Sequence, residues 1–119
     1  MKYMLLIYDD ERVWERMSES ERHQLFGEYM QYTEQIKASG QYCAGAPLQP
    51  VATATSVRVR DGQQLITDGP FAETREQLGG YYLVDAPNLD EAIALAGRIP
   101  SARLGTIEVR PVMEIPAAT

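Results

Sequence analysis

The sequence is poor in cysteine, histidine and basic residues, and each shortage excludes a class of protein. It contains one cysteine, Cys43, and one histidine, His23, so it can form neither an internal disulfide framework nor the usual ligand set of a structural zinc site. Lys and Arg number 11 against 17 Asp and Glu, for a net charge of −6. Because nucleic-acid binding needs a basic patch, we expect no nucleic-acid partner. With one cysteine and one histidine, we also expect no metal, and no motif in the sequence suggests another cofactor.

Long apolar runs are also missing. The N-terminal run 3–8 is too short for a signal peptide and meets Asp9 and Asp10 at once, and no segment approaches the roughly 20 apolar residues that cross a membrane. The run instead predicts a buried central strand. With a single cysteine, the chain suits the reducing cytoplasm. Its 119 residues, 45% of them apolar, fit a single domain that we expect to span 1–119.

Periodicity and turn residues predict alternating strands and helices. A first helix begins at the capping box of Ser18 and Glu21 and ends at Gly40. Its predicted apolar stripe is Leu25, Phe26, Tyr29, Met30, Thr33 and Ile36. A second helix begins at Asn88, ends before Pro100, and has the stripe Leu89, Ile93 and Ala96. The predicted strands are 3–8, 41–46, 56–60, 64–67, 81–84 and 106–110.

The order of these elements predicts the fold class. The Asp61-Gly62 turn joins 56–60 and 64–67 as a hairpin. Without this insertion the order is βαββαβ, the ferredoxin-like α+β arrangement, with both helices on one face of an antiparallel sheet. We expect the other face to expose Ile107, Val109, part of the first strand and one of the tyrosines 81 and 82. An uncovered apolar face predicts a homodimer.

The segment 67–76 gathers charges, turn residues and an aromatic ring between the hairpin and the next strand. Asp68 ends a strand at a sharp corner made by Gly69 and Pro70. One interpretation is that its carboxylate is a general base or accepts hydrogen bonds from a ligand. The other is a turn aspartate that bonds its own backbone. Phe71 likewise fits a pocket wall or an anchor in a dimer core.

Other residues offer weaker candidates with structural alternatives. Arg75 can bind a carboxylate or phosphate ligand, or pair with Glu73 in solvent. Tyr82 can orient a ligand if it faces the pocket. His23 can move a proton, or be an exposed residue at the edge of the first helix.

The strand termini supply two further expectations. Asp9 and Asp10 either lie near the pocket at the end of the first strand or cap a short helical segment over 11–17. Cys43, inside a predicted strand, is expected to be an inert core thiol. Both expectations depend on how the strands are placed in the sheet.

The motif Asp68-Gly69-Pro70-Phe71, with Glu73, the run 76–82 and the run 108–111, resembles the DGPF branch of the YCII-related (YciI-like) family. The resemblance covers nearly the whole chain and implies a dimeric α+β barrel of ferredoxin-like protomers. Some relatives are similar to lyase-type enzymes that act on chlorinated aromatics through a His/Asp pair. Others occur beside extracytoplasmic-function sigma factors. Here Glu28 stands where the family histidine is expected, so His23, five residues earlier, is the histidine that remains as a catalytic candidate with Asp68.

Two functions follow from the sequence. The first is a cofactor-free enzyme of lyase or isomerase type, with Asp68 as acid/base on a small organic molecule. Its ligand-binding residues would be Gly69, Pro70, Phe71, Glu73, Arg75 and Tyr82. The second is a non-catalytic dimeric ligand-binding or regulatory module that contacts a sigma factor. The enzyme predicts an Asp68 that is partly buried beside a cavity, and the module predicts a flat apolar patch away from the motif.

Overall fold

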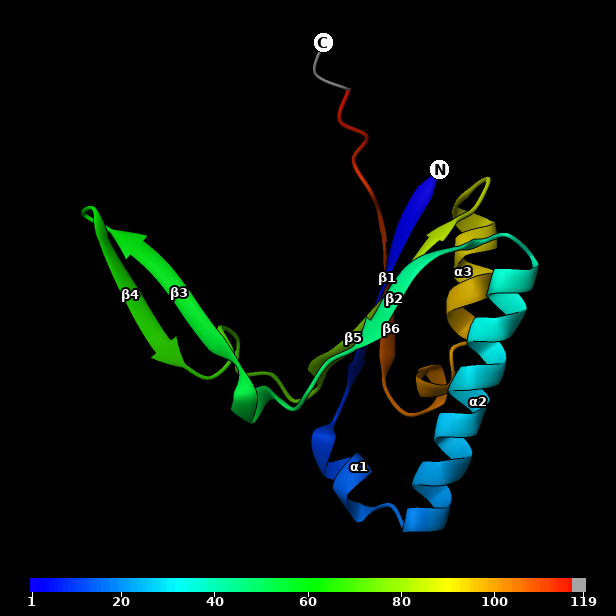
Figure 1. The fold of residues 1–119 in the computed structure, drawn as a ribbon, viewed down its shortest axis with the longest axis horizontal. Helices are drawn as coiled ribbons and strands as arrows, with labels where there is room; N and C mark the ends of the chain where they lie inside the picture. Colours follow the sequence, from blue (N-terminus) through cyan, green and yellow to red (C-terminus); the bar gives the residue numbers. More distant parts are fainter. Residues whose placement is uncertain (117–119) are drawn as a thin grey trace.

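A four-stranded antiparallel sheet with helices on one face forms the body of the protein (Figure 1). The computed structural model describes residues 1–116. The strands are β1 (Lys2–Asp9), β2 (Tyr42–Pro47), β5 (Gln77–Asp85) and β6 (Thr106–Pro111) in the body, and β3 (Thr55–Arg60) and β4 (Gln63–Asp68) in a hairpin. The helices are α1 (Glu11–Arg16), α2 (Glu19–Ala38) and α3 (Leu89–Gly97), with 3-10 turns at η1 (Val51–Thr53) and η2 (Pro100–Arg103).

The strand order β2-β5-β1-β6 confirms the ferredoxin-like α+β fold, and the hairpin is inserted between β2 and β5. β1 is central and pairs antiparallel with both β5 and β6. None of the helices within residues 1–116 is long and apolar enough to cross a membrane.

The predicted helix caps are present. The Ser18 hydroxyl accepts from the Glu21 amide at 3.1 Å, and the Glu21 carboxylate accepts from the Ser18 amide at 3.1 Å. Gly40 follows α2 with φ 78°, a conformation that favours glycine. Asn88 caps α3 by accepting from the Glu91 amide at 2.9 Å. These local bonds satisfy donors that a helix end leaves free, so the helix limits follow from the sequence.

The core lies between the sheet and the helices. β1 and β5 alternate, so that every second side chain enters it. The buried cluster contains Tyr3, Leu5, Ile7, Tyr32, Ile36, Tyr82, Val84, Ala86, Ala92, Leu95, Ala96 and Ile99. Each large apolar side chain in such a cluster contributes roughly 1.5–3 kcal/mol to folding, so this layer stabilises the body.

The predicted stripe of α2 is partly wrong. Phe26 and Met30 are 60% and 57% exposed, whereas Tyr32, which the stripe omitted, is 3% exposed. The Tyr32 hydroxyl donates to the Leu95 carbonyl at 2.9 Å. Burial of tyrosine is favourable when its hydroxyl finds such a partner, and apolar spacing does not report that partner.

The predicted stripe of α3 is partly wrong. Ala96 is buried as predicted, but Leu89 and Ile93 are 48% and 52% exposed, and the buried Ala92 and Leu95 were not in the stripe. The small Ala92 side chain, fully buried, is on the face of α3 that meets the core. The contact surface is therefore set by close packing and not by the largest side chains.

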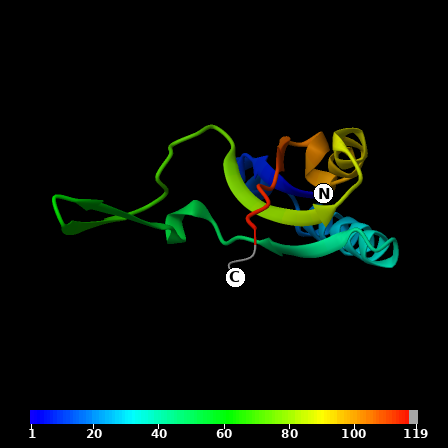
Figure 2. The same ribbon diagram turned by 90° about the horizontal axis from the view of Figure 1, so that it is seen from above.

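One face of the sheet has no cover within the described chain (Figure 2). We call this the open face, and it carries Met4, Leu6, Tyr8, Tyr81 and Leu83, all of them half-buried. Ile107 and Val109 were predicted to be there, but they pack against the core on the helix side. The strand register explains the correction, because Val109 pairs with Leu5 and Ile107 with Ile7, both of which are buried.

Cys43 is exposed, which corrects the expectation of a core thiol. It lies on β2, an edge strand, at a register shift between Tyr42 and Ala44. A bulge of this kind leaves a residue outside the regular pairing.

The hairpin β3–β4, called the arm below, projects from the sheet on the side opposite to the helices (Figure 1). Its turn is formed by Asp61 (φ 52°) and Gly62 (φ 74°), as the Asp-Gly pair predicted. The two strands form a sheet of their own, separate from the body sheet.

Candidate functional site

A broad, open hollow of about 710 Å³ lies on the open face where β1 ends. It is lined by Tyr8, Thr74, Arg75, Glu76, Thr106 and Glu108. These residues come from β1, the segment that enters β5, and β6. The volume lies within the range of small-molecule sites, and the lining combines one guanidinium, two carboxylates and a phenol.

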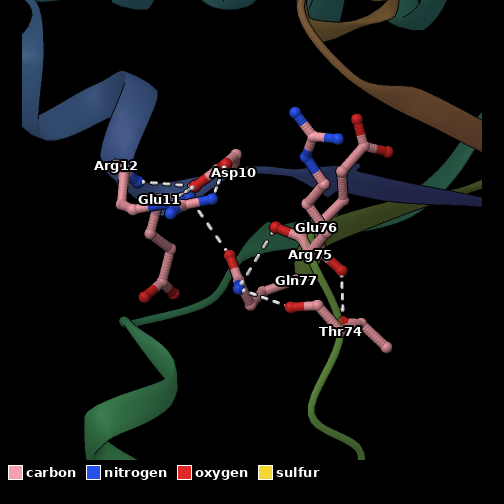
Figure 3. Close-up of polar contacts among 7 residues, drawn as sticks. All are labelled: Asp10, Glu11, Arg12, Thr74, Arg75, Glu76 and Gln77. Atoms are coloured by element: carbon pink, nitrogen blue, oxygen red, sulfur yellow. Dashed lines mark hydrogen bonds and ion pairs between the residues drawn. The ribbon is translucent and has the colours of Figure 1, made fainter.

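The carboxylate of Glu76 is held in place at this hollow. The Thr106 hydroxyl donates to it at 2.8 Å from β6, which lies on the other side of β1 from β5. In Figure 3 the side chains of Arg75 and Glu76 extend in the same direction. A cation and an acid thus lie at one end of the sheet, where they can bind an oxygen-rich ligand and exchange a proton with it.

The amide of Gln77 fixes the wall of the hollow (Figure 3). Its nitrogen donates to the carbonyl of Thr74 at 2.9 Å, and its oxygen accepts from the backbone amide of Glu11 at 3.1 Å. The Thr74 hydroxyl also bonds the carbonyl of Glu76. The segment before β5, which supplies Thr74, Arg75 and Glu76 to the hollow, is therefore tied to the start of α1.

A partly buried polar chain lies on the helix side of the same sheet end. Tyr29 donates to the Ser101 hydroxyl at 2.5 Å, and Ser101 donates to the Asp9 carboxylate at 3.3 Å. Burial raises the pKa of Asp9 above its ordinary value; the bond from Ser101 lowers it, and the carboxylates of Glu11 and Glu76 raise it further. Burial also raises the pKa of Tyr29 to about 12.

Of the two alternatives for the aspartates at the end of β1, the cap of the short helix is confirmed. Asp9 bonds Ser101 on the helix side and does not line the hollow. Asp10 caps α1, with its carboxylate accepting from the Arg12 amide at 2.9 Å. Hydrogen bonds from Arg12 lower the pKa of Asp10 to about 2. Ser101, 2% exposed, was not singled out by the sequence.

Asp68 is exposed at the end of β4 and does not line the hollow, so the partly buried Asp68 beside a cavity that the enzyme hypothesis predicted is not found in the protomer. Other groups hold its corner: the Gly69 amide donates to the Ala54 carbonyl at 2.7 Å, and the Ser56 hydroxyl donates to the Gly69 carbonyl at 2.8 Å. Gly69 has φ 106°, which side chains rarely tolerate. Within residues 1–116, no hydrogen bond to the Asp68 carboxylate is found, so turn closure does not account for that carboxylate.

The rest of the motif lies along the segment between the arm and β5. Phe71 is 77% exposed, and the guanidinium of Arg58 lies 5.3 Å from the centre of its ring. Pro70 and Glu73 are exposed as well. Arg75 is the one predicted ligand-binding residue among the residues lining the hollow.

Tyr82 and His23 lie on the helix side of the sheet. Tyr82 is 7% exposed, shares a hydrogen bond of 2.6 Å with the Thr33 hydroxyl, and packs edge-on against Tyr32. Its place in the core follows from its pairing with Leu5 across the sheet, so Tyr81 is the tyrosine on the open face. His23 is exposed on α2.

Glu28 stands where the family histidine was expected, and it bonds Arg103 at 2.7 Å. The salt bridge connects α2 with η2 on the helix side. This position is therefore occupied by a structural ion pair in the protomer.

Known proteins similar to this chain agree with its fold. The model of the YCII-related domain matches residues 1–116. An uncharacterised protein of Rhizobium meliloti (strain 1021) is 36% identical over 114 residues, which cover 94% of this chain and 92% of the relative. The structure of 5-chloro-2-hydroxyhydroquinone dehydrochlorinase (TftG) from Burkholderia phenoliruptrix AC1100, in complex with 2,5-dihydroxybenzoquinone, is similar with a TM-score of 0.54 and 16% identity. The match covers 95% of this chain and 94% of that one and shows a shared fold. The chain belongs to the YCII-related domain family.

Proposed function

We propose that the protein is a small cofactor-free enzyme of lyase or isomerase type that binds an oxygen-rich organic molecule in the hollow. The observation that carries this proposal is the placement of Arg75 with Glu76 and Glu108 around one open volume. A guanidinium binds pairs of oxygens through parallel hydrogen bonds, and carboxylates accept and return protons. Asp68 is exposed and lies outside the hollow of its own protomer, so its proposed role as acid/base requires a second copy of the chain that brings it beside a hollow. His23, on the other side of the sheet, takes no part.

The neighbour of similar fold supports the choice of ligand class. That neighbour is a dehydrochlorinase in complex with 2,5-dihydroxybenzoquinone, which is a flat ring with several oxygens. The hollow offers Arg75 for such oxygens and the ring of Tyr8 as an aromatic wall. The hollow is therefore large enough for a hydroxylated ring and offers groups that suit its oxygens and its face.

A second copy of the chain is the proposed cover of the open face, as in a dimeric α+β barrel. The face carries half-buried apolar side chains and contains the hollow. Burying it removes apolar surface from water and closes the hollow, which strengthens the electrostatic interactions inside it. Sedimentation velocity at micromolar concentration is expected to show a dimer, and a monomer would contradict the proposal.

Binding of 2,5-dihydroxybenzoquinone and related hydroxylated rings tests the hollow directly. Ligand-observed NMR is expected to detect at least one of these probes on the wild-type protein. Arg75→Ala should weaken its binding at least tenfold, about 1.4 kcal/mol, while the matched control Arg16→Ala, at the end of α1, binds as the wild type does. Equal binding by wild type and Arg75→Ala would remove the hollow from the proposal.

Turnover separates an enzyme from a binding protein. For a ring that binds, deuterium uptake from heavy water measures proton exchange. The enzyme proposal expects exchange by the wild type and its loss in Asp68→Asn, with binding retained. Binding without exchange or conversion would favour the module.

The regulatory module remains a second candidate because of one observation. Phe26 and Met30 lie one turn apart on α2 and are exposed, away from the motif. Exposed apolar side chains of this kind suit a protein partner. The family resemblance suggests an extracytoplasmic-function sigma factor as that partner. If this candidate is correct, a purified extracytoplasmic-function sigma factor should bind the wild type and lose affinity for the Phe26→Ser/Met30→Ser variant.

A further inference from the structure

The arm exposes apolar side chains that its own protomer does not cover. Those of β3 and β4 are exposed as follows: Val57 55%, Val59 60%, Leu65 47% and Ile66 64%. The two strands contact each other far more than any other element. Because an isolated two-stranded hairpin is at best marginally stable in water, this arm needs a surface to pack against.

The arm has two unlike faces. Val57 pairs with Ile66, and Thr55 pairs with Asp68. Since side chains alternate along a strand, Val57, Ile66 and Asp68 share one face with Val59. The other face carries Leu65 and the arginines, with the ring of Phe71 next to Arg58. The carboxylate of Asp68 therefore belongs to the apolar face, at the end nearest the body.

Hydrogen bonds at the base hold the arm in one direction. The Val51 amide donates to the Glu11 carboxylate at 2.9 Å, and the Leu48 amide donates to the Gly79 carbonyl at 2.8 Å. At the end of β4, the Gly69 amide donates to the Ala54 carbonyl at 2.7 Å, which joins the two strands at the base of the arm. Figures 1 and 2 show that this direction is away from the helices, on the side of the open face. Whatever covers the open face therefore lies beside the arm.

We propose that the face formed by Val57, Val59 and Ile66 packs against a second copy of the chain, enclosing Asp68 at the boundary between the two copies. This rests on the proposed dimer and deepens the proposed site, because Asp68 is exposed until the second copy arrives. The two-fold symmetry usual for dimers would give each protomer one arm and one receiving surface. The site is then complete only in the dimer.

Continuity and charge favour a second copy as the occupant. The arm lies on the same side as the open face, so one partner can cover both. Within the arm, Arg58 and Arg60 balance Asp61 and Asp68, so it is neutral, while the whole chain has a net charge of −6. A neutral apolar arm meets little of the repulsion that two acidic bodies would otherwise exert on each other.

Dimer dissociation tests the packing of the arm. Val57→Ser/Ile66→Ser changes the apolar face, and Leu65→Ser is the matched control on the opposite face of the same hairpin. Analytical ultracentrifugation is expected to show at least a tenfold rise in the dissociation constant for the first variant and less than a twofold change for the control. If the wild type is a dimer and Val57→Ser/Ile66→Ser has the same dissociation constant, the proposed role of the arm is wrong but the proposed dimer stands. A monomeric wild type overturns the proposed dimer as well.

Carbodiimide labelling tests the position of Asp68 without any substitution. Carboxylates that react with a carbodiimide and an amine are read by mass spectrometry, above and below the dimer dissociation constant. Labelling of Asp68 is expected to fall at least fivefold in the dimer, while Asp61 at the tip of the arm keeps its labelling. Equal labelling of Asp68 in monomer and dimer would overturn its enclosure by the second copy.

Discussion

The body and the arm are stabilised by different interactions. In the body, Leu5 and Ile36 are 0% exposed and pack between sheet and helices. In the arm, Ile66 is 64% exposed, and the order comes from a tight turn, ladder pairing and hydrogen bonds at the base. The body therefore carries its stability within one protomer, whereas the arm displays apolar surface that only another molecule can bury.

The motif that identifies the family lies at the boundary between these regions. Gly69 closes the base of the arm, and Arg75 enters the hollow of the body. Side chains between them, such as Phe71, are exposed in the protomer. The motif thus connects the hollow of the body with side chains that are exposed in the protomer, which is why we propose that the function depends on the contact between two copies.

The sharpest test of this difference compares core and arm truncations. Leu5→Ala is expected to lower the free energy of unfolding by about 2–5 kcal/mol, because it leaves a cavity in a packed layer. Ile66→Ala should change it by roughly 0.5 kcal/mol or less, as for an exposed site. Urea unfolding below the dimer dissociation constant measures both. Equal losses would show that the arm is part of the same packed unit.

The corner of the arm gives the next largest effect. At φ 106°, Gly69→Ala is expected to cost on the order of 1–3 kcal/mol of backbone strain. An added Cβ at this position would meet nothing within 4 Å, so the cost is conformational and not steric. Hydrogen exchange should show faster exchange of the amides of β3 and β4 and little change in β1. A uniform loss across the body would contradict the separation of the two regions.

The cap of α2 tests the body by a smaller change. Ser18→Ala removes the acceptor of the Glu21 amide and is expected to cost about 1 kcal/mol. Thermal or urea unfolding measures the loss, and Ser18→Thr, which keeps the hydroxyl, is the control. A loss in Ser18→Thr equal to that in Ser18→Ala would show that the hydroxyl is not what stabilises the helix.

Element order, helix caps and the arm's turn were predictable because each depends on neighbouring residues. The Ser18–Glu21 box and the Asp61-Gly62 turn are local chemistry, and the structure confirms both. The burial of Tyr32 was not predictable, since its partner, the Leu95 carbonyl, is distant in sequence. Periodicity reports that a helix has an apolar face, but the partner element decides which side chains are buried.

The residues of the candidate site were likewise predictable only where local sequence pointed to them. Asp68 and Arg75 were suggested by residue type and by the corner beside them, and Arg75 does line the hollow. The contribution of Thr106 and Glu108 depends on the pairing of β6 with β1, which brings Thr106 opposite Tyr8. Ser101 becomes notable only because Tyr29 and Asp9, from two other elements, meet at its hydroxyl. Local signals could not reveal groups that only strand register and helix packing bring together.

The smallest expected effect concerns the pH dependence of the body. Burial raises the pKa of Asp9 above 3.8, so the folded protein binds this proton more tightly than the unfolded chain. Stability due to this group is then fully present below pH 3.8 and falls as the pH rises through the raised pKa. Asparagine cannot ionise, so Asp9→Asn should be more stable than wild type at neutral pH. Its advantage should shrink as the pH falls and disappear below pH 3.8.

Unfolding curves from pH 3 to pH 8 measure this difference. Asp61→Asn on the arm is the control, because it removes an exposed carboxylate from a turn whose φ of 52° asparagine accepts. Subtracting the change in unfolding free energy of Asp61→Asn from that of Asp9→Asn separates the effect of burial at Asp9 from the general effect of losing one negative charge. If Asp9→Asn were instead less stable at neutral pH, the hydrogen bond from Ser101 would outweigh burial, and Asp9 would be an ionised anchor of the body. If Asp9→Asn is more stable, the ionised Asp9 lowers the stability of the fold. Such a carboxylate lies at the same end of the sheet as the hollow, where we propose proton transfer.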